Sequence, residues 1–211
     1  GHEGANMWAW AINYVVADGK MRGLFTMLFG ASMILIADRA EGQRPGPASI
    51  HYRRVFWLFV FGMLHAYLLF FGDILVCYAL AGAVVFLFRK WSPKLLIGIG
   101  ALVLAGLVVK GLIETDHLEK LRALASSPDA SEATRKAWAQ NGFILNPPAS
   151  MGEAEIKGYR GGFIDAVKAR SMAAMILQTV IMFNETLWEA IAQMMIGIGL
   201  YRLGFFTLGW K

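Results

Sequence analysis

Two ionisable residues, His65 and Asp73, lie within long apolar stretches and are eight positions apart. Histidine titrates near neutral pH and suits general-base catalysis, and ionisable groups at membrane depth are costly enough to indicate a function. This spacing corresponds to about two helical turns, so both side chains could face one side of a helical hairpin. Two simpler interpretations stay open: a neutral His65 bonded to a neighbouring helix, and an Asp73 that caps a helix beginning at Ile74.

Basic residues flank these stretches and are candidates for binding an anion. Lys20 and Arg22 precede an apolar stretch, where they could contact an anionic substrate or simply reach the membrane interface. Arg53 and Arg54 begin the stretch that contains His65. They could hold the phosphates of a donor or a lipid, or they could anchor the chain on the cytoplasmic side without any ligand.

Two further polar clusters lie nearer the C-terminus. Tyr159 and Arg160 lead into a double glycine, a turn that could clamp a substrate or close a loop against the membrane. Glu185 and Glu189 lie on one helix face and could bind a cation or share a proton, unless Glu185 only favours a helix N-terminus. No histidine, cysteine or carboxylate spacing matches a metal site, so we predict no metal. The single Cys77 excludes an internal disulfide.

The composition indicates what kind of fold must position these residues. Of the 211 residues, 57% are hydrophobic and 17% are charged, whereas soluble domains average about 45–50% and about 25%. These proportions exclude an ordinary soluble domain and intrinsic disorder. The sequence therefore predicts an all-α, polytopic transmembrane helix bundle whose immediate partner is the lipid bilayer.

Stretches without charge predict the membrane spans, because a spanning helix needs about 20 apolar residues. The run 55–89, interrupted only by Asp73, would be about 50 Å long as one helix. We therefore expect a turn near 71–73. Residues 163–182 are expected as an interfacial helix before the last span, with two full crossings as the alternative. The predicted spans are 21–37, 55–71, 73–89, 94–112 and 187–206, and 113–170 is a predicted polar extramembrane segment with short helices near 116–125 and 131–140.

Positive charge in the short connections predicts the orientation. Residues 38–54 and 89–94 are rich in Lys and Arg, whereas the turn at 72–73 contains neither. Basic connections stay in the cytoplasm, so the turn at 72–73 and the segment 110–170 are expected outside. This topology explains the net charge of +5, and nucleic acid is not an expected partner.

Several short segments carry a pattern that extends over nearly the whole chain. They are 19–31 (GKMRGLFTMLFGA), 53–54 leading into 64–66 (LHA), 72–75 (GDIL) with 78–79, 159–162 (YRGG) and 197–205 (GIGLYRLGF). In this order they resemble the YeiB-like family of bacterial inner-membrane proteins, which is classed by a domain of unknown function. That family has a further helix before this region and several after it. The resemblance thus implies missing flanking helices of the same protein.

The same family is remotely similar to transmembrane acyltransferases, which move an acyl group from a coenzyme A thioester to an acceptor. The resemblance implies an acyltransferase-like protein of the bacterial inner membrane, with an acyl-CoA donor and no tightly bound cofactor. We expect His65 to be the catalytic base, with His2 as an alternative. Asp73 is expected to orient His65 or to support it electrostatically. Arg53 and Arg54 would meet the donor. Substrate contacts are expected from the four residues Lys20, Arg22, Tyr159 and Arg160.

Two functions from other classes stay open. A transporter or exporter of a small amphipathic molecule would use His65 and Asp73 for proton coupling or substrate contact, although the internal repeats common in transporters are not evident. A non-enzymatic membrane subunit would use the segment 110–170 as a docking surface. A homo-oligomer is compatible with each of these functions.

Overall fold

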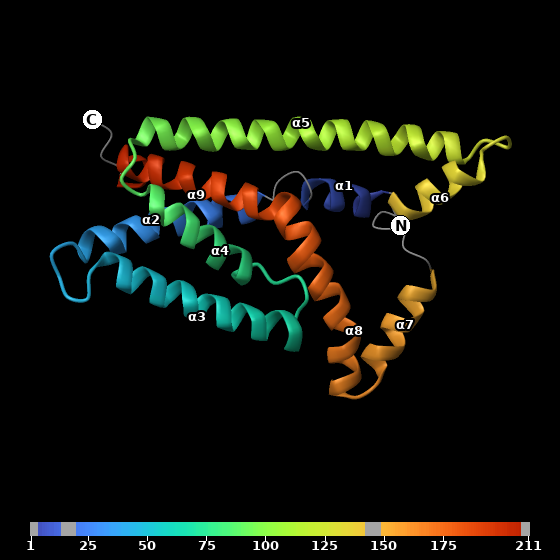
Figure 1. The fold of residues 1–211 in the computed structure, drawn as a ribbon, viewed down its shortest axis with the longest axis horizontal. Coiled ribbons are helices and arrows are strands. Elements are labelled where there is room, and N and C mark those ends of the chain that lie inside the picture. Colours follow the sequence, from blue (N-terminus) through green and yellow to red (C-terminus); the bar gives the residue numbers. More distant parts are fainter. Residues whose placement is uncertain (1–3, 14–19, 142–148, 208–211) are drawn as a thin grey trace.

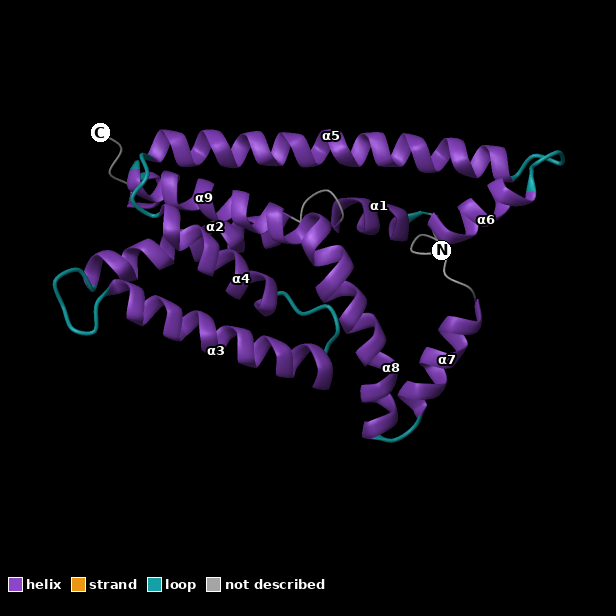
Figure 2. Ribbon diagram, viewed as in Figure 1, coloured by secondary structure: helices purple, strands orange, loops and turns teal. Residues whose placement is uncertain are grey.

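The computed structural model describes residues 4–13, 20–141 and 149–207, and this part of the chain is helical with no β-strand (Figure 2). The predicted all-α fold class is therefore confirmed. The α-helices are α1 (Ala5–Ile12), α2 (Lys20–Arg39), α3 (Pro47–Leu68), α4 (Leu75–Val85), α5 (Pro93–Ala125), α6 (Glu132–Asn141), α7 (Ala149–Arg160), α8 (Phe163–Ile176) and α9 (Leu187–Arg202). Shorter elements are the 3₁₀ turns η2 (Phe86–Phe88) and η4 (Phe205–Thr207) and the π-helical segment η3 (Leu177–Thr186).

Three helices among the described residues are long and apolar enough to cross a membrane: Lys20–Arg39, Pro93–Ala125 and Phe163–Arg202. Large apolar side chains remain exposed on their outer faces, for example Leu102 at 73% and Phe25 at 65%. A water-soluble protein would bury such residues, whereas lipid accepts them. The exposed apolar faces therefore agree with a helical membrane protein.

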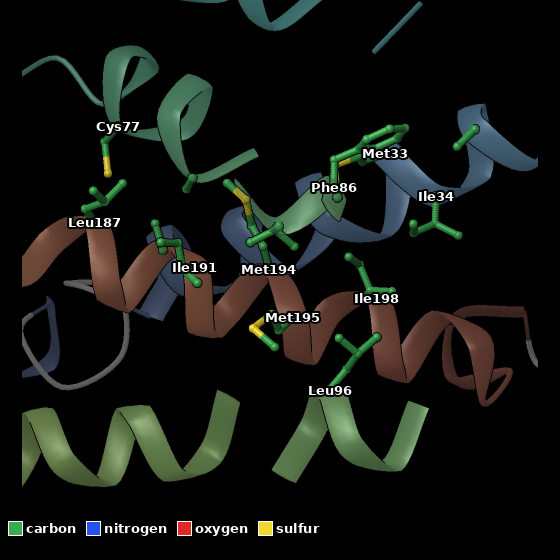
Figure 3. Packing of buried hydrophobic residues seen from close by; sticks show 14 of the residues in the cluster. Met33, Ile34, Cys77, Phe86, Leu96, Leu187, Ile191, Met194, Met195 and Ile198 are labelled. Carbon is green, nitrogen blue, oxygen red and sulfur yellow. The ribbon is translucent and has the colours of Figure 1, made fainter. Parts of the chain in front are cut away.

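Helix α9 is the centre of the bundle and packs against α2, α4 and α5 (Figure 1). Met194 and Ile198 of α9 are fully buried, and Ile34 of α2 and Leu96 of α5 are buried with them (Figure 3). Small residues permit this close packing, since a Cβ atom at Gly100 of α5 would lie 2.7 Å from the Ala192 carbonyl oxygen.

Helices α3 and α4 form the hairpin expected from the long uncharged run, with the turn between Leu68 and Leu75. The two helices approach closely, because a Cβ atom at Gly62 would lie 2.8 Å from the Val76 nitrogen. Helix α4 begins two residues later than the predicted span 73–89, since Asp73 lies before the helix rather than within it. The apolar helix Leu75–Phe88 is shorter than the other candidate spans.

The polar segment 113–170 differs from its prediction at its start. The expected short helix near 116–125 is the end of α5, which runs unbroken for 33 residues. Ion pairs one turn apart stabilise this extension: Lys110 with Glu114 at 3.3 Å and Lys120 with Asp116 at 2.6 Å. The second expected helix, near 131–140, corresponds to α6. Residues 142–148 lie outside the described part of the chain.

The C-terminal region is one helix from Phe163 to Arg202 rather than an interfacial helix followed by a separate span. The segment η3 joins α8 to α9 without a break, and Figure 1 shows that the helix changes direction between them. π-helical turns explain the bend, because they widen the helix and interrupt its regular hydrogen bonding. Helix α9 ends at Arg202, four residues before the predicted end of the span, and Gly204 there has φ of 82°.

The basic connections lie together at one end of the bundle. The connection between α2 and α3, the turn between η2 and α5, and the end of α9 are all at the left of Figure 1. The turn between α3 and α4 is at the other end of that hairpin, near the middle of the picture. The Arg202 guanidinium donates a hydrogen bond to the Trp91 carbonyl oxygen at 3.0 Å, which joins two of these basic connections. This arrangement is the one that the orientation prediction requires.

Candidate functional site

The structure brings His65 and Asp73 into direct contact at the α3–α4 turn. The His65 Nδ1–H donates a hydrogen bond to Asp73 Oδ1 at 2.9 Å, and the Val76 backbone N–H donates to Asp73 Oδ2 at 3.0 Å. Asp73 thus caps α4 and binds the histidine at the same time, one carboxylate oxygen for each role. The two interpretations of Asp73 drawn from the sequence are therefore compatible.

This geometry determines which histidine nitrogen is free to react. A carboxylate only accepts hydrogen bonds, so its contact with Nδ1 places the proton on Nδ1 and leaves the lone pair on Nε2. The Asp73 side chain is fully buried, whereas 37% of the His65 side chain is exposed. A buried orienting carboxylate beside an accessible imidazole is the arrangement of a general base.

An apolar cavity of about 450 Å³ adjoins His65. His65 is the single ionisable residue among its lining side chains, which belong to α3, the following turn, α4 and the start of α8. The lining residues are Phe61, Leu64, His65, Leu68, Leu69, Leu75 and Phe163. Such a cavity suits a hydrocarbon chain with one reactive polar group next to the imidazole.

Arg170 of α8 lies beside the end of α3. It was not among the candidate residues predicted from the sequence. It is 7% exposed, and its guanidinium donates a hydrogen bond of 2.5 Å to the Leu68 carbonyl oxygen, while its Nε has no partner within the described residues. Cations favour helix C-termini, where carbonyl groups lack helical partners. The sequence signal was weak: an arginine followed by an uncharged run. Arg170 fixes α8 against the helix that carries His65.

We expect Arg170→Leu to lower stability by about 1.5–3 kcal/mol, the range for hydrogen bonds to charged groups. The loss arises because the last turn of α3 would keep a carbonyl oxygen without its donor. Thermal unfolding of the detergent-purified protein measures it. The exposed Arg160→Leu is the control and should change little. Equal melting temperatures for the two variants would contradict the role given to Arg170.

Arg22 and Glu189 form a second polar cluster between α2 and α9. They are paired at 2.9 Å, and Gln193 donates to the other Glu189 oxygen at 2.9 Å. The Thr26 and Tyr78 hydroxyl groups share a hydrogen bond of 2.6 Å nearby. Arg22 therefore pairs with a carboxylate of the protein and links α2 to α9. Because this pairing neutralises its charge, the predicted role of Arg22 as an anion site is weakened.

Two other predicted contact residues, Arg53 and Arg54, lie apart from His65 on α3. Arg53 and Arg54 are on the opposite half of α3, and His65 follows Arg54 by eleven positions, about 16 Å along a helix. Lys20 is exposed at the start of α2, and Arg160 is exposed at the end of α7. The structure therefore separates Arg53 and Arg54 from the histidine, and neither Lys20 nor Arg160 lines the cavity beside His65.

Three further predictions have different outcomes. Tyr159 is next to the site, with its ring centre 5.6 Å from the Arg170 guanidinium carbon. Glu185 and Glu189 each have their own cation, since Glu185 contacts Lys110 at 3.6 Å; a shared proton between them is therefore not supported. His2 lies outside the described residues, which contain no group of three His, Cys, Asp or Glu side chains able to hold a metal.

The described residues form a helical protein with helices long and apolar enough to cross a membrane and with a histidine–aspartate pair next to an apolar cavity. The chain is similar to YxaH of Bacillus subtilis, with 45% identity over 74 residues, and to YeiB of Escherichia coli, with 28% identity over 149 residues. Both relatives are uncharacterised. The matched regions cover 35% and 65% of this chain but only 18% and 34% of the relatives. No protein-family model and no solved structure matches the chain.

Proposed function

We propose that this chain is part of a membrane-bound acyltransferase of the bacterial inner membrane, with His65 as its general base. The observation that carries the proposal is the Asp73–His65 hydrogen bond at the wall of an apolar cavity. The chain covers 18% and 34% of these bacterial relatives, so the proposed activity is assigned to the full-length protein.

In the proposed reaction, His65 Nε2 removes a proton from the acceptor hydroxyl or amine. The acceptor oxygen or nitrogen then forms a bond with the acyl carbonyl carbon of an acyl-CoA donor, and the carbon–sulfur bond breaks. The departing thiolate receives the proton from the imidazolium, so His65 returns to its neutral form. Asp73 keeps the required tautomer and stabilises the imidazolium while it exists.

The apolar cavity supports acyl chemistry in particular. Leu64, Leu68 and Leu75 offer the apolar surroundings that a hydrocarbon chain prefers. The predicted donor role of Arg53 and Arg54 would require a donor that reaches along half of α3, so it is left out of this proposal.

The proposal is tested with the full-length protein in lipid nanodiscs. Purified protein is supplied with acyl-CoA donors of increasing chain length and with a membrane lipid extract as the source of acceptors, and the release of free coenzyme A thiol is measured. We expect turnover that depends on both donor and acceptor. Failure of every donor to yield acylated lipid or soluble product would contradict the proposal.

A transporter is the second candidate, and the segment η3 favours it. Ten residues of π-helix bend this apolar helix, and π-helical turns are frequent at functional sites. Flux of an amphipathic solute into proteoliposomes without any acyl donor would favour transport. Stable association with another protein, together with dispensable His65 and Asp73, would favour the non-enzymatic subunit.

A further inference from the structure

A second cavity, of about 270 Å³, lies between α2 and α3 at the half of the bundle away from His65. Its walls are largely apolar and come from both helices. They include Phe29 and Met33 of α2 and Val55, Leu58 and Phe61 of α3. Arg54 is the single residue with a permanent charge in this lining. The cavity therefore combines a hydrocarbon environment with one cation.

The other polar groups of this cavity have partners within the protein. The Ser32 hydroxyl donates to the Phe29 carbonyl oxygen at 2.8 Å, and His51 Nε2 contacts the Gly82 carbonyl oxygen at 3.1 Å. The His51 ring also stacks on Phe86 at 4.1 Å. Arg54, in contrast, makes no hydrogen bond or ion pair with the residues that the structure describes. Arg54 is exposed, so its guanidinium group is accessible to an anion at the mouth of this apolar cavity.

The surroundings of Arg54 indicate a ligand from the membrane. Arg54 lies in the first half of α3, and α3 begins at the basic connection from α2, on the predicted cytoplasmic side (Figure 1). Clusters of Lys and Arg at this interface attract the anionic lipids of the cytoplasmic leaflet. Positive-inside anchoring alone explains the cations, but it does not explain the apolar cavity next to Arg54.

We propose that the cavity between α2 and α3 binds one anionic phospholipid, with the phosphate at Arg54 and an acyl chain between the two helices. Phe29, Val55 and Leu58 contact the chain, and Phe61 marks its far end, since this ring also lines the cavity beside His65. The site is independent of the proposed acyl transfer, because it needs neither His65 nor a donor.

The test uses full-length protein in phosphatidylcholine nanodiscs that contain phosphatidylglycerol with a photoreactive acyl chain. Irradiation followed by peptide mass spectrometry locates the labelled residues. We expect labels on the α2 and α3 peptides that contain Phe29 and Leu58. Arg54→Gln should reduce this labelling about fivefold, as expected for the loss of one cation near an anionic surface. Arg53→Gln is the matched control, because Arg53 does not line the cavity, and should label normally.

Further measurements show whether the cavity between α2 and α3 holds an anionic lipid, the acyl donor or a helix of the same protein. Leu58→Trp fills the cavity and should reduce labelling by phosphatidylglycerol and by a photoreactive phosphatidylcholine alike. Equal labelling of the Arg54→Gln and Arg53→Gln variants would overturn the proposal. Displacement of the label by a soluble long-chain acyl-CoA would assign the cavity to the donor instead. A map of the intact protein with one of its own helices in the cavity would also overturn it.

Discussion

We expect the His65→Gln protein to insert and fold normally and to transfer acyl groups at least about 100-fold more slowly than the natural protein, the lower end of general-base contributions. Glutamine has similar bulk and keeps a hydrogen-bonding group near Asp73, but it cannot accept and return a proton. Coenzyme A release by the full-length protein in nanodiscs measures the loss. His51→Gln is the matched control, since His51 is the other histidine of α3 and bonds to Gly82 instead.

Asp73→Asn separates an orienting role from a capping role. An asparagine side chain can accept the Val76 N–H bond through its oxygen, and its amide group then donates to His65 Nδ1. That contact moves the imidazole proton to Nε2, so the base loses its reactive lone pair. We expect a rate loss comparable to that of His65→Gln with little change in melting temperature.

Asp73→Ala should have an additional effect on stability. Removal of the cap leaves the Val76 N–H without its partner and costs about 0.5–2 kcal/mol. If Asp73→Asn transferred acyl groups at the natural rate while Asp73→Ala only melted earlier, Asp73 would be a cap alone. The histidine would then act without it, or not at all.

We also expect a large loss of stability from Gly197→Leu, at the contact between α9 and α2. A Cβ atom at Gly197 would clash with the Met27 carbonyl oxygen, so any larger side chain must separate the two helices. Overpacking of this kind costs typically about 1–3 kcal/mol and more where the backbone must move. We expect a strongly lowered melting temperature, measured by fluorescence-detected size-exclusion chromatography of heated detergent samples.

Gly98→Leu in α5 is the control for this prediction. A Cβ atom at Gly98 would have nothing within 4 Å in the described structure, so the substitution should change stability by no more than about 0.5 kcal/mol. If both leucine variants melted like the natural protein, α2 and α9 would not form the close contact that centres the bundle on α9.

Much of the site could be predicted from the sequence because it is local. His65 and Asp73 are eight positions apart at the end of one predicted span, and the length of the uncharged run requires a hairpin there. Arg22 and Glu189 could not be paired in this way, since 167 positions separate them. Arg170 was missed for the same reason: its partner, the Leu68 carbonyl oxygen, is 102 positions away and carries no side-chain signal.

The sequence by itself predicted a helical protein with apolar membrane-spanning segments and a hairpin of α3 and α4, and it made a shared side for His65 and Asp73 possible. Hydrophobicity and helical periodicity decide these features over short distances along the chain. Only the tertiary structure showed that α5 and the helix from Phe163 to Arg202 continue without a break. It also showed that Arg22 pairs with Glu189 and that Arg54 lines a second cavity, separate from the one beside His65. Those features depend on which helix faces pack together, and the same apolar composition allows many pairings.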